Sequence, residues 1–223
     1  CRDNNKKISL VPTMGGLHDG HLKLVDRARA ISDIVVVSIF VNPTQFARGE
    51  DFEDYPNTLS SDQKKLESKG VDVLFLPSKG EIYPDGLHND YRVGEIGQIL
   101  CGAFRPNHFD GVAQVVQRFF NIVKPDYSVF GEKDYQQLLI IKSLVDKLKL
   151  DIFIESVETK REIDGLAMST RNQYLSNGDR KKAPNFYLKL NALKKSILDG
   201  NSIEKSRLRA IDDLDEEFET EYL

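Results

Sequence analysis

The stretch Ile34-Val35-Val36-Val37-Ser38-Ile39-Phe40-Val41 decides the fold class of this chain, because it is apolar almost without interruption. A strand that is apolar on both faces belongs in the centre of a parallel sheet, where helices cover both sides. Shorter runs of the same kind recur, and we expect strands at Ile8–Pro12, Val71–Pro77, Tyr127–Phe130 and Asp151–Val157. Stretches of helical periodicity alternate with them, which predicts right-handed βαβ units and a mostly parallel α/β sheet.

Six helices are expected between and after these strands. Four of them would cover the sheet, at Leu22–Ala30, Leu59–Lys69, Gly111–Val123 and Gln136–Leu148. Two lie in a tail dense in Lys, Arg, Asp and Glu, at Lys181–Leu198 and Ile203–Phe218, and predict a small helical appendage. The stretch from Ser78 to Pro106 is rich in Gly, Pro, Asp and Asn, which predicts an irregular excursion near the site.

Composition restricts the class of protein. A length of 223 residues suits one large α/β domain, or one domain with a smaller appendage. A net charge of −4 argues against a broad nucleic-acid surface and leaves small molecules as the expected partners. The only two cysteines, Cys1 and Cys101, have no paired spacing, and neither a secretory leader nor a membrane-spanning apolar run is evident. We therefore expect a soluble protein of a reducing compartment.

The segment Met14 to His21, Met-Gly-Gly-Leu-His-Asp-Gly-His, follows the first predicted strand and precedes the first predicted helix. Gly15 and Gly16 carry no Cβ, so a polyphosphate could approach the main chain, and free N–H groups at a helix start favour an anion. His18 and His21 are three residues apart and can share one face of the helix. The segment predicts a nucleotide-phosphate site. A metal pair, a solvated helix start or a plain turn are the alternatives.

Three further loops carry polar side chains after predicted strands, and ligands of open parallel sheets bind beyond the carboxyl ends of strands. Asn42–Phe46 offers the Gln45 amide, Gly131–Asp134 offers a lysine and a carboxylate, and Met168–Arg171 offers hydroxyls and a guanidinium. Each could equally be a polar turn or a helix cap. Convergence of these loops with Met14–His21 on one crevice is what favours a ligand site.

Two other histidines are expected to be structural. His108 and Asp110 lie in Arg105–Gly111, before a long amphipathic helix, and suit a helix cap or a subunit contact, while Arg105 could contact a carboxylate. His88 has no supporting neighbours and is expected at the surface.

With these motifs in place, the chain closely resembles the pantothenate synthetase (pantoate–β-alanine ligase) family. The resemblance runs from about Ile8 to Ser176. It rests on motifs that occur in the family's order, namely Val11-Pro12-Thr13-Met14-Gly15, His18-Asp19-Gly20-His21, Val41-Asn42-Pro43-Thr44-Gln45-Phe46, Arg105-Pro106, His108-Phe109, Phe130-Gly131-Glu132-Lys133-Asp134 and Gly165-Leu166-Ala167-Met168-Ser169.

The resemblance implies a Rossmann-like domain of the nucleotidyltransferase type. It also implies a reaction in which ATP and pantoate give pantoyl adenylate and pyrophosphate, after which β-alanine displaces AMP to make pantothenate. Mg²⁺ would accompany the phosphates. The expected protein is a cytoplasmic homodimer whose partners are ATP, pantoate and β-alanine, with no nucleic acid and no membrane.

Residue roles follow from the resemblance by position. The catalytic residues would be His21 as proton donor, His18, Lys133 and Arg171, with Gln45 and Gln137 holding pantoate and Gln45 also near β-alanine. The metal ligands stay unassigned. The implied ATP-binding residues are Met14, Gly15, Gly16, Leu17, His18, Asp19, Gly20, His21, Gly131, Glu132, Lys133, Asp134, Met168, Ser169, Thr170 and Arg171.

The chain departs from the family pattern at Thr170, Cys101 and Lys160, where a serine, a glutamate and an apolar residue are more usual. Family members also continue into a small domain that closes over the site. We therefore expect residues 1–176 to be the ATP- and pantoate-binding domain and residues 177–223 to be the helical start of a small, incomplete C-terminal lid domain. Another nucleotidyltransferase of the same fold, or a catalytically silent nucleotide-binding module, are the alternative functions.

Overall fold

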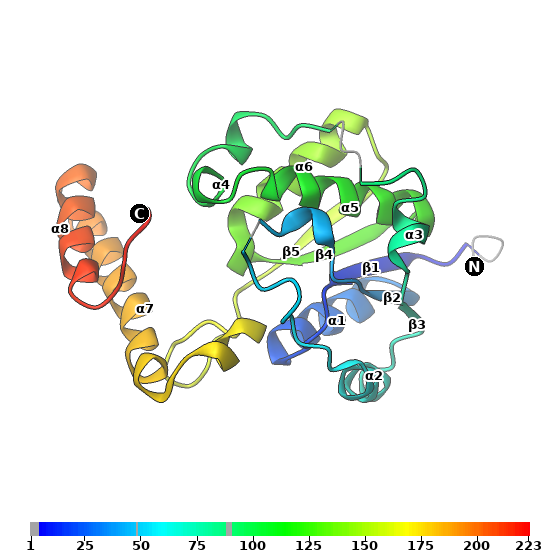
Figure 1. Cartoon of the computed structure of the whole chain (residues 1–223), viewed down its shortest axis with the longest axis horizontal. Helices are drawn as coiled ribbons and strands as arrows, with labels where there is room; N and C mark the ends of the chain where they lie inside the picture. Colours follow the sequence, from blue (N-terminus) through cyan, green and yellow to red (C-terminus); the bar gives the residue numbers. More distant parts are fainter. Residues whose placement is uncertain (1–4, 48, 88–90) are drawn as a thin grey trace. The chain divides into compact units, whose positions relative to one another are not determined.

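A computed structural model describes residues 5–47, 49–87 and 91–223 (Figure 1). The chain forms two compact units, of which the first ends at Thr159 and the second runs from Lys160 to Leu223, and each is described by itself. The predictions made for Cys1 and His88 fall outside the described residues.

The first unit is built on one parallel sheet of five strands in the order β3-β2-β1-β4-β5. Every predicted strand is present, so the expected parallel α/β architecture is confirmed. The bounds are β1 Ile8–Thr13, β2 Ile34–Ile39, β3 Val73–Phe75, β4 Tyr127–Gly131 and β5 Phe153–Val157.

Strand β2 is shorter than the sequence predicts, because Phe40 and Val41 lie beyond its end. The N–H of Phe40 still donates to the Thr13 carbonyl at 3.0 Å, which keeps the exits of β1 and β2 together. Pro43 then starts a short 3-10 helix, η2 Pro43–Gln45, and this turn takes the chain out of the sheet.

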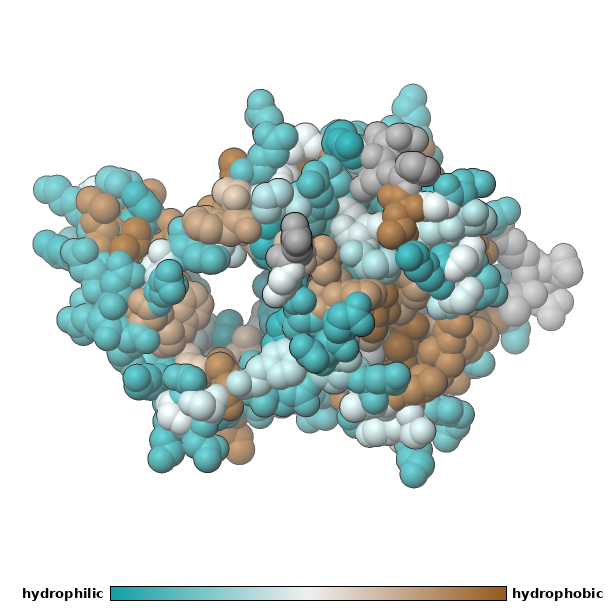
Figure 2. Space-filling view, viewed as in Figure 1, coloured by the Kyte–Doolittle hydropathy of each residue, from teal (hydrophilic) through white to brown (hydrophobic). Residues whose placement is uncertain are grey.

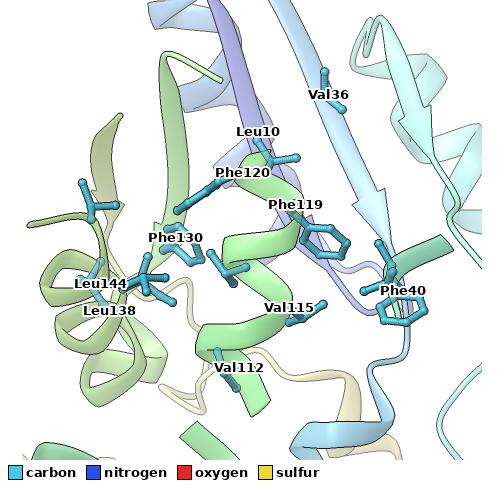
Figure 3. Packing of buried hydrophobic residues seen from close by; sticks show 14 of the residues in the cluster. Leu10, Val36, Phe40, Val112, Val115, Phe119, Phe120, Phe130, Leu138 and Leu144 are labelled. Atoms are coloured by element: carbon cyan, nitrogen blue, oxygen red, sulfur yellow. The ribbon is translucent and has the colours of Figure 1, made fainter. Parts of the chain in front are cut away.

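Side chains alternate between the two faces of the sheet, and each face has its own apolar core. Leu10, Val36 and Phe130 face helices α5 (His108–Val123) and α6 (Tyr135–Leu148), where Val112, Val115, Phe119, Phe120, Leu138 and Leu144 complete the cluster (Figure 3). On the other face, Val11, Val37 and Val129 pack with Val25, Ala28 and Leu66 of helices α1 (Asp19–Ile31) and α2 (Leu59–Ser68). The four predicted covering helices are thus confirmed, two on each face.

Apolar surface remains at the edge of the sheet. Figure 2 shows a brown region where Figure 1 places β3, and there Val73 and Leu76 are 45% and 46% exposed. Strand β3 pairs only with β2, so one of its sides has no neighbouring strand in the described sheet.

The excursion from Ser78 to Pro106 is more regular than predicted. It contains α3 Lys79–Ile82, the 3-10 helix η3 Glu95–Gly97 and α4 Cys101–Phe104. A capping box explains α3, since the N–H of Ser78 donates to the Glu81 carboxylate at 2.6 Å and the N–H of Glu81 donates to the Ser78 hydroxyl at 3.3 Å. The sequence does carry the signal for this helix, a Ser followed three residues later by Glu.

The second unit contains a bridge between Arg161 and Ala167, the 3-10 helix η5 Thr170–Tyr174, and helices α7 Asn177–Leu198 and α8 Ile203–Asp215. Its first residues pack on its own helix α7, because the Arg161 guanidinium lies 3.4 Å from the centre of the Tyr187 ring. Arg180 also pairs with Asp164 at 2.6 Å. These contacts explain why the compact units divide after Thr159, earlier than the expected boundary after Ser176. Among the helices the structure describes, none is long and apolar enough to cross a membrane.

Candidate active site

The order of the strands places two of the predicted loops side by side. Strands β1 and β4 are neighbours at the centre of the sheet, and the chain winds outward from them in opposite directions. Met14–His21 follows β1 and Gly131–Asp134 follows β4, so both lie at the edge where ligands of such sheets bind. The Asn42–Phe46 loop follows β2, the other neighbour of β1.

A tight glycine turn leads from β1 into α1. Gly15 and Gly16 have φ angles of +88° and +62°, which side chains with a Cβ rarely adopt. A Cβ on Gly15 would also lie 3.1 Å from Cγ2 of Ile39 and 3.4 Å from the Asp62 carboxylate. The turn itself therefore requires glycine at these positions, as in the plain-turn alternative that the sequence leaves open.

Asp62 of helix α2 fixes this turn by hydrogen bonds to its main chain. Its side chain is 1% exposed, and its two oxygens accept hydrogen bonds from the N–H groups of Gly16 and Leu17, each at 2.9 Å. The Thr58 hydroxyl donates to the same carboxylate at 3.0 Å, and the Lys65 ammonium donates to the Leu17 carbonyl at 2.5 Å. We call Asp62 and Lys65 the α2 clamp. Sequence reasoning missed it, although an acidic residue one turn before the buried Leu66 was a signal.

The expectation of free N–H groups in this loop is wrong. The N–H groups of Gly16 and Leu17 are taken by the clamp, and that of Gly15 donates to the Thr13 hydroxyl at 3.3 Å. Leu17 also buries its side chain in the core. The candidate ligand groups of this loop are therefore its side chains, and the two histidines come first among them.

His18 and His21 form the entry of helix α1, which begins at Asp19, three residues earlier than the predicted Leu22. His18 is the N-cap residue, and its Nδ1 accepts from the Gly20 N–H at 3.1 Å. Nδ1 of His21 accepts from the His18 N–H at 3.3 Å. A ring nitrogen that accepts carries no proton, so each neutral ring has its proton on Nε2. The rings, with centroids 4.1 Å apart, thus each offer an Nε2–H donor.

Both histidines are held neutral. Burial lowers the pKa of His21 to about 3, and the neighbouring His18 and the charges of Lys133 and Lys65 act in the same direction. The pKa of His18 is lowered as well, first by burial and then by Lys133. Cations that lower the pKa values of both histidines make the site electropositive, and an electropositive site favours binding of a polyphosphate.

Lys133 lies in the 3-10 helix η4, Glu132–Asp134, directly after β4. Its ammonium pairs with the exposed Asp134 carboxylate at 3.2 Å. Glu132 is directed to the neighbouring strand, since it accepts from the Ser156 hydroxyl at 3.1 Å. Lys133 is therefore the cation that η4 contributes to the electropositive site.

Gln45 brings the β2 loop to the β1 loop. Its Nε2 lies 3.1 Å from Sδ of Met14, and its Oε1 accepts from the Asn42 amide at 3.1 Å. Gln137 is the third residue of α6 and is half-buried at the same edge of the sheet. The structure thus joins the loops of β1 and β2 by a direct contact, and the strand order places the β4 loop at the same edge of the sheet.

The fourth segment, Met168–Arg171, belongs to the second unit. It does not follow β5 directly, because the turn closed by Arg161 and Ala167 intervenes. Ser169 caps η5 by accepting from the Arg171 N–H at 3.3 Å, so the capping alternative for this loop is present. Its participation in the site stays a prediction.

His108 is structural in a way the sequence did not suggest. It is the first residue of α5, but it makes no helix cap, and within the described chain the N-cap Asn107 makes no side-chain cap either. The buried His108 ring contacts the Gln45 carbonyl and Arg105, while Arg105 binds the carboxylate of Glu50. The expected carboxylate partner of Arg105 is thus a residue of the protein itself.

Comparisons with known proteins identify one family. The family model described as pantoate-beta-alanine ligase matches residues 1–223. A pantothenate synthetase of Vesicomyosocius okutanii is 50% identical over 221 residues, covering 99% of this chain and 78% of the relative.

Two solved structures are similar to this chain over nearly its full length. Pantothenate synthetase from Thermus thermophilus aligns with a TM-score of 0.93 and 45% identity, covering 97% of this chain and 80% of that one. Pantoate-beta-alanine ligase from Francisella tularensis, complexed with beta-gamma ATP and beta-alanine, aligns with a TM-score of 0.80 and 41% identity, covering 93% and 78%.

Proposed function

The chain belongs to the pantoate–β-alanine ligase family, and on this premise we propose how its residues carry out the reaction. The family fold is of the nucleotidyltransferase type, and the activity is ATP-dependent ligation of pantoate and β-alanine with formation of a C–N bond. The observation that carries the residue assignments is the meeting of His18, His21 and Lys133 at the exits of the two central strands.

We infer that the reaction passes through pantoyl adenylate. A carboxylate is a poor electrophile, so its oxygen must first become part of a good leaving group. The pantoate carboxylate would attack the α-phosphorus of ATP and release pyrophosphate. The β-alanine amine would then attack the activated carbonyl carbon, lose its proton and displace AMP, which leaves pantothenate.

The phosphates would lie on the side chains of the β1 and β4 loops. Neutral His18 and His21 would each donate through Nε2–H to phosphate oxygens, and Lys133 would supply a full positive charge. Because these donors are held in place before ATP binds, little reorganisation is needed as charge builds on the departing pyrophosphate. His21 would act as the proton donor implied by the resemblance. The implied contacts of Met14–Gly20, Gly131, Glu132 and Asp134 complete this assignment.

Magnesium would arrive with ATP. Within residues 5–47, 49–87 and 91–223, no group of three or more His, Cys, Asp or Glu side chains could hold a metal ion. Mg²⁺ is commonly bound through substrate phosphates with few protein ligands, and in that form it supplies charge neutralisation to the triphosphate. The described residues therefore fit a Mg·ATP substrate better than a resident metal.

Removal of magnesium is expected to abolish turnover and leave the fold intact. An excess of EDTA should reduce AMP release to the background rate, while the melting temperature measured without nucleotide changes by less than about 1 °C. A large loss of thermal stability in EDTA would instead reveal a structural metal and contradict the assignment.

Pantoate would be held by the glutamines. Its hydroxyl and carboxylate groups need polar partners, and the side-chain amides of Gln45 and Gln137 offer both a donor and an acceptor. In Gln45→Ala and Gln137→Ala, we expect the KM for pantoate to rise at least tenfold and the KM for ATP less than twofold. Steady-state kinetics with each substrate varied in turn checks this. Equal increases for both substrates would show that the pantoate assignment is wrong.

Residues of the second unit would complete the enzyme. We propose that Met168–Arg171, with its two hydroxyls and one guanidinium, closes over the triphosphate, and that residues 177–223 begin a small lid domain. Water excluded by such a lid could not hydrolyse the adenylate. The family resemblance also supports a homodimer located in the cytoplasm.

One assay tests the whole proposal. AMP release is measured with ATP, pantoate and β-alanine, and with each omitted in turn. Release should require all three substrates at steady state, with pyrophosphate formed from ATP and pantoate alone in a first turnover. A nucleotide-binding module without catalysis would bind ATP and release no AMP. A different nucleotidyltransferase would release pyrophosphate with another acceptor and not with pantoate.

A further inference from the structure

We propose that His108 and Arg105 are positioning residues for pantoate, which hold the Gln45 loop through a chain of hydrogen bonds that begins at Glu50. The inference rests on the proposed role of Gln45 as a pantoate contact. It adds residues that determine the affinity for pantoate without contacting pantoate themselves.

The chain of contacts is continuous and short. The Glu50 carboxylate accepts two hydrogen bonds from the Arg105 guanidinium, both at 2.6 Å. Another nitrogen of the same guanidinium lies 3.1 Å from Nε2 of His108. Nδ1 of His108 lies 2.6 Å from the main-chain carbonyl of Gln45, and a nitrogen of the Arg105 guanidinium lies 3.5 Å from the same carbonyl. Four residues from three segments thus form one network that ends on the Gln45 carbonyl, with His108 as the closer donor.

The tautomer of His108 follows from its partners. A guanidinium can only donate, so Nε2 of His108 must be the accepting nitrogen. The proton of the neutral ring is then on Nδ1, where it donates to the Gln45 carbonyl. Burial lowers the pKa of His108, and the charge of Arg105 acts in the same direction, while the hydrogen bond to the Gln45 carbonyl and the charges of Glu50 and Asp134 oppose it. The ring therefore has one defined orientation and one defined direction of donation.

Helix α5 packs tightly against the Gln45 loop and holds it at both ends. The helix approaches η2 so closely that a Cβ on Gly111 would lie 2.2 Å from the Thr44 carbonyl. The Asn42 amide donates to the Gly111 carbonyl at 3.2 Å, which fixes the start of η2. His108 fixes its end, at the main chain of Gln45 itself. With both ends fixed, the Gln45 amide is kept against Met14 at the β1 exit.

This arrangement predicts a selective kinetic effect. Loss of the His108 hydrogen bond should leave the Gln45 carbonyl with only the long 3.5 Å contact to Arg105, and should raise the KM for pantoate about tenfold. The KM for ATP should change less than twofold, because the phosphate residues belong to the β1 and β4 loops. A merely structural histidine would affect both substrates, or only thermal stability.

Two amide variants give a matched test. In His108→Asn the amide nitrogen takes the place of Nδ1, so the bond to the Gln45 carbonyl can re-form and the KM for pantoate should stay within threefold of the parent. In His108→Gln the amide takes the place of Nε2. The contact with Arg105 is therefore kept, and the hydrogen bond from residue 108 to the Gln45 carbonyl is lost. The KM for pantoate should then rise as in His108→Leu. Equal behaviour of the Asn and Gln variants would overturn the inference.

A double-mutant comparison separates this inference from the function it rests on. If Gln45→Ala alone leaves the KM for pantoate unchanged, the proposed pantoate site is wrong. If Gln45→Ala raises it, adding His108→Leu should raise it less than twofold further, because His108 acts through Gln45. A full additional tenfold increase would refute the positioning role. Nitrogen-15 NMR of the unmodified protein should show the Nδ1–H tautomer, and an Nε2–H tautomer would also refute it.

Discussion

His21→Ala is expected to slow AMP release about 10³-fold, which corresponds to about 4 kcal/mol of barrier, as for a lost oxyanion donor. The variant removes an Nε2–H donor from a half-buried, electropositive site and leaves the His18 N–H without its acceptor. The effect should appear mainly in kcat, since the charge that this donor meets is greatest while pyrophosphate departs.

Two amide variants separate the chemistry of His21 from its place in the helix cap. In His21→Asn the side-chain oxygen can still accept from the His18 N–H, but nothing replaces the Nε2–H donor. We expect near-normal unfolding by urea and a loss of rate close to that of His21→Ala. In His21→Gln a donor is restored near the Nε2 position, and the rate should recover at least tenfold over alanine. A normal rate in His21→Asn would contradict the phosphate role.

Asp62→Ala is expected to lower the free energy of unfolding by about 3 kcal/mol, because it leaves two buried N–H groups without an acceptor. The affected donors are Gly16 and Leu17, whose turn precedes His18. Loss of the clamp should also misplace both histidines, since a shift of about 1 Å can cost about 10²-fold in rate. Urea unfolding and steady-state AMP release measure the two effects.

Asp26→Asn is the matched control for Asp62. Asp26 also carries its carboxylate on a helix of the same face, but it is 56% exposed and pairs with Lys69 at 2.9 Å. A surface ion pair of this kind contributes about 0–1 kcal/mol, so stability and rate should be close to those of the parent. If Asp62→Ala behaved like this control, the clamp would have no role in holding the turn.

Local patterns were sufficient to predict the architecture. The nearly continuous apolar run beginning at Ile34 indicated a central parallel strand, and alternating strands and helices indicated the covering layers. Two kinds of error occurred, at the ends of elements and at short capped helices, and in both capping decides the outcome. Helix α1 begins at Asp19 because His18 serves as its cap, a residue type that propensity rules do not favour there. Helix α3 was missed although Ser78 and Glu81 carried its signal.

The residue types of the site could also be predicted, because polar loops after parallel strands meet at one edge of the sheet. The hydrogen-bond partners of these residues could not be predicted. The sequence leaves a ligand and a plain turn open for the two glycines, and it does not indicate that Asp62 accepts from the N–H groups of Gly16 and Leu17. His108 was expected to cap a helix or to lie at a subunit contact, whereas it supports the Gln45 carbonyl.

The parallel α/β sheet, the loops that carry chemistry and, through their motifs, the ligase family could all be predicted, because each depends on residues close together in the chain. The folded structure was needed to find that Asp62 binds a turn 45 residues away, that His18 and His21 carry their protons on Nε2, and that Glu50, Arg105 and His108 form a network ending at the Gln45 carbonyl. Such contacts depend on how α2 and α5 pack against the sheet. Packing places side chains that are distant in sequence within hydrogen-bond distance, and no local pattern records which ones will meet.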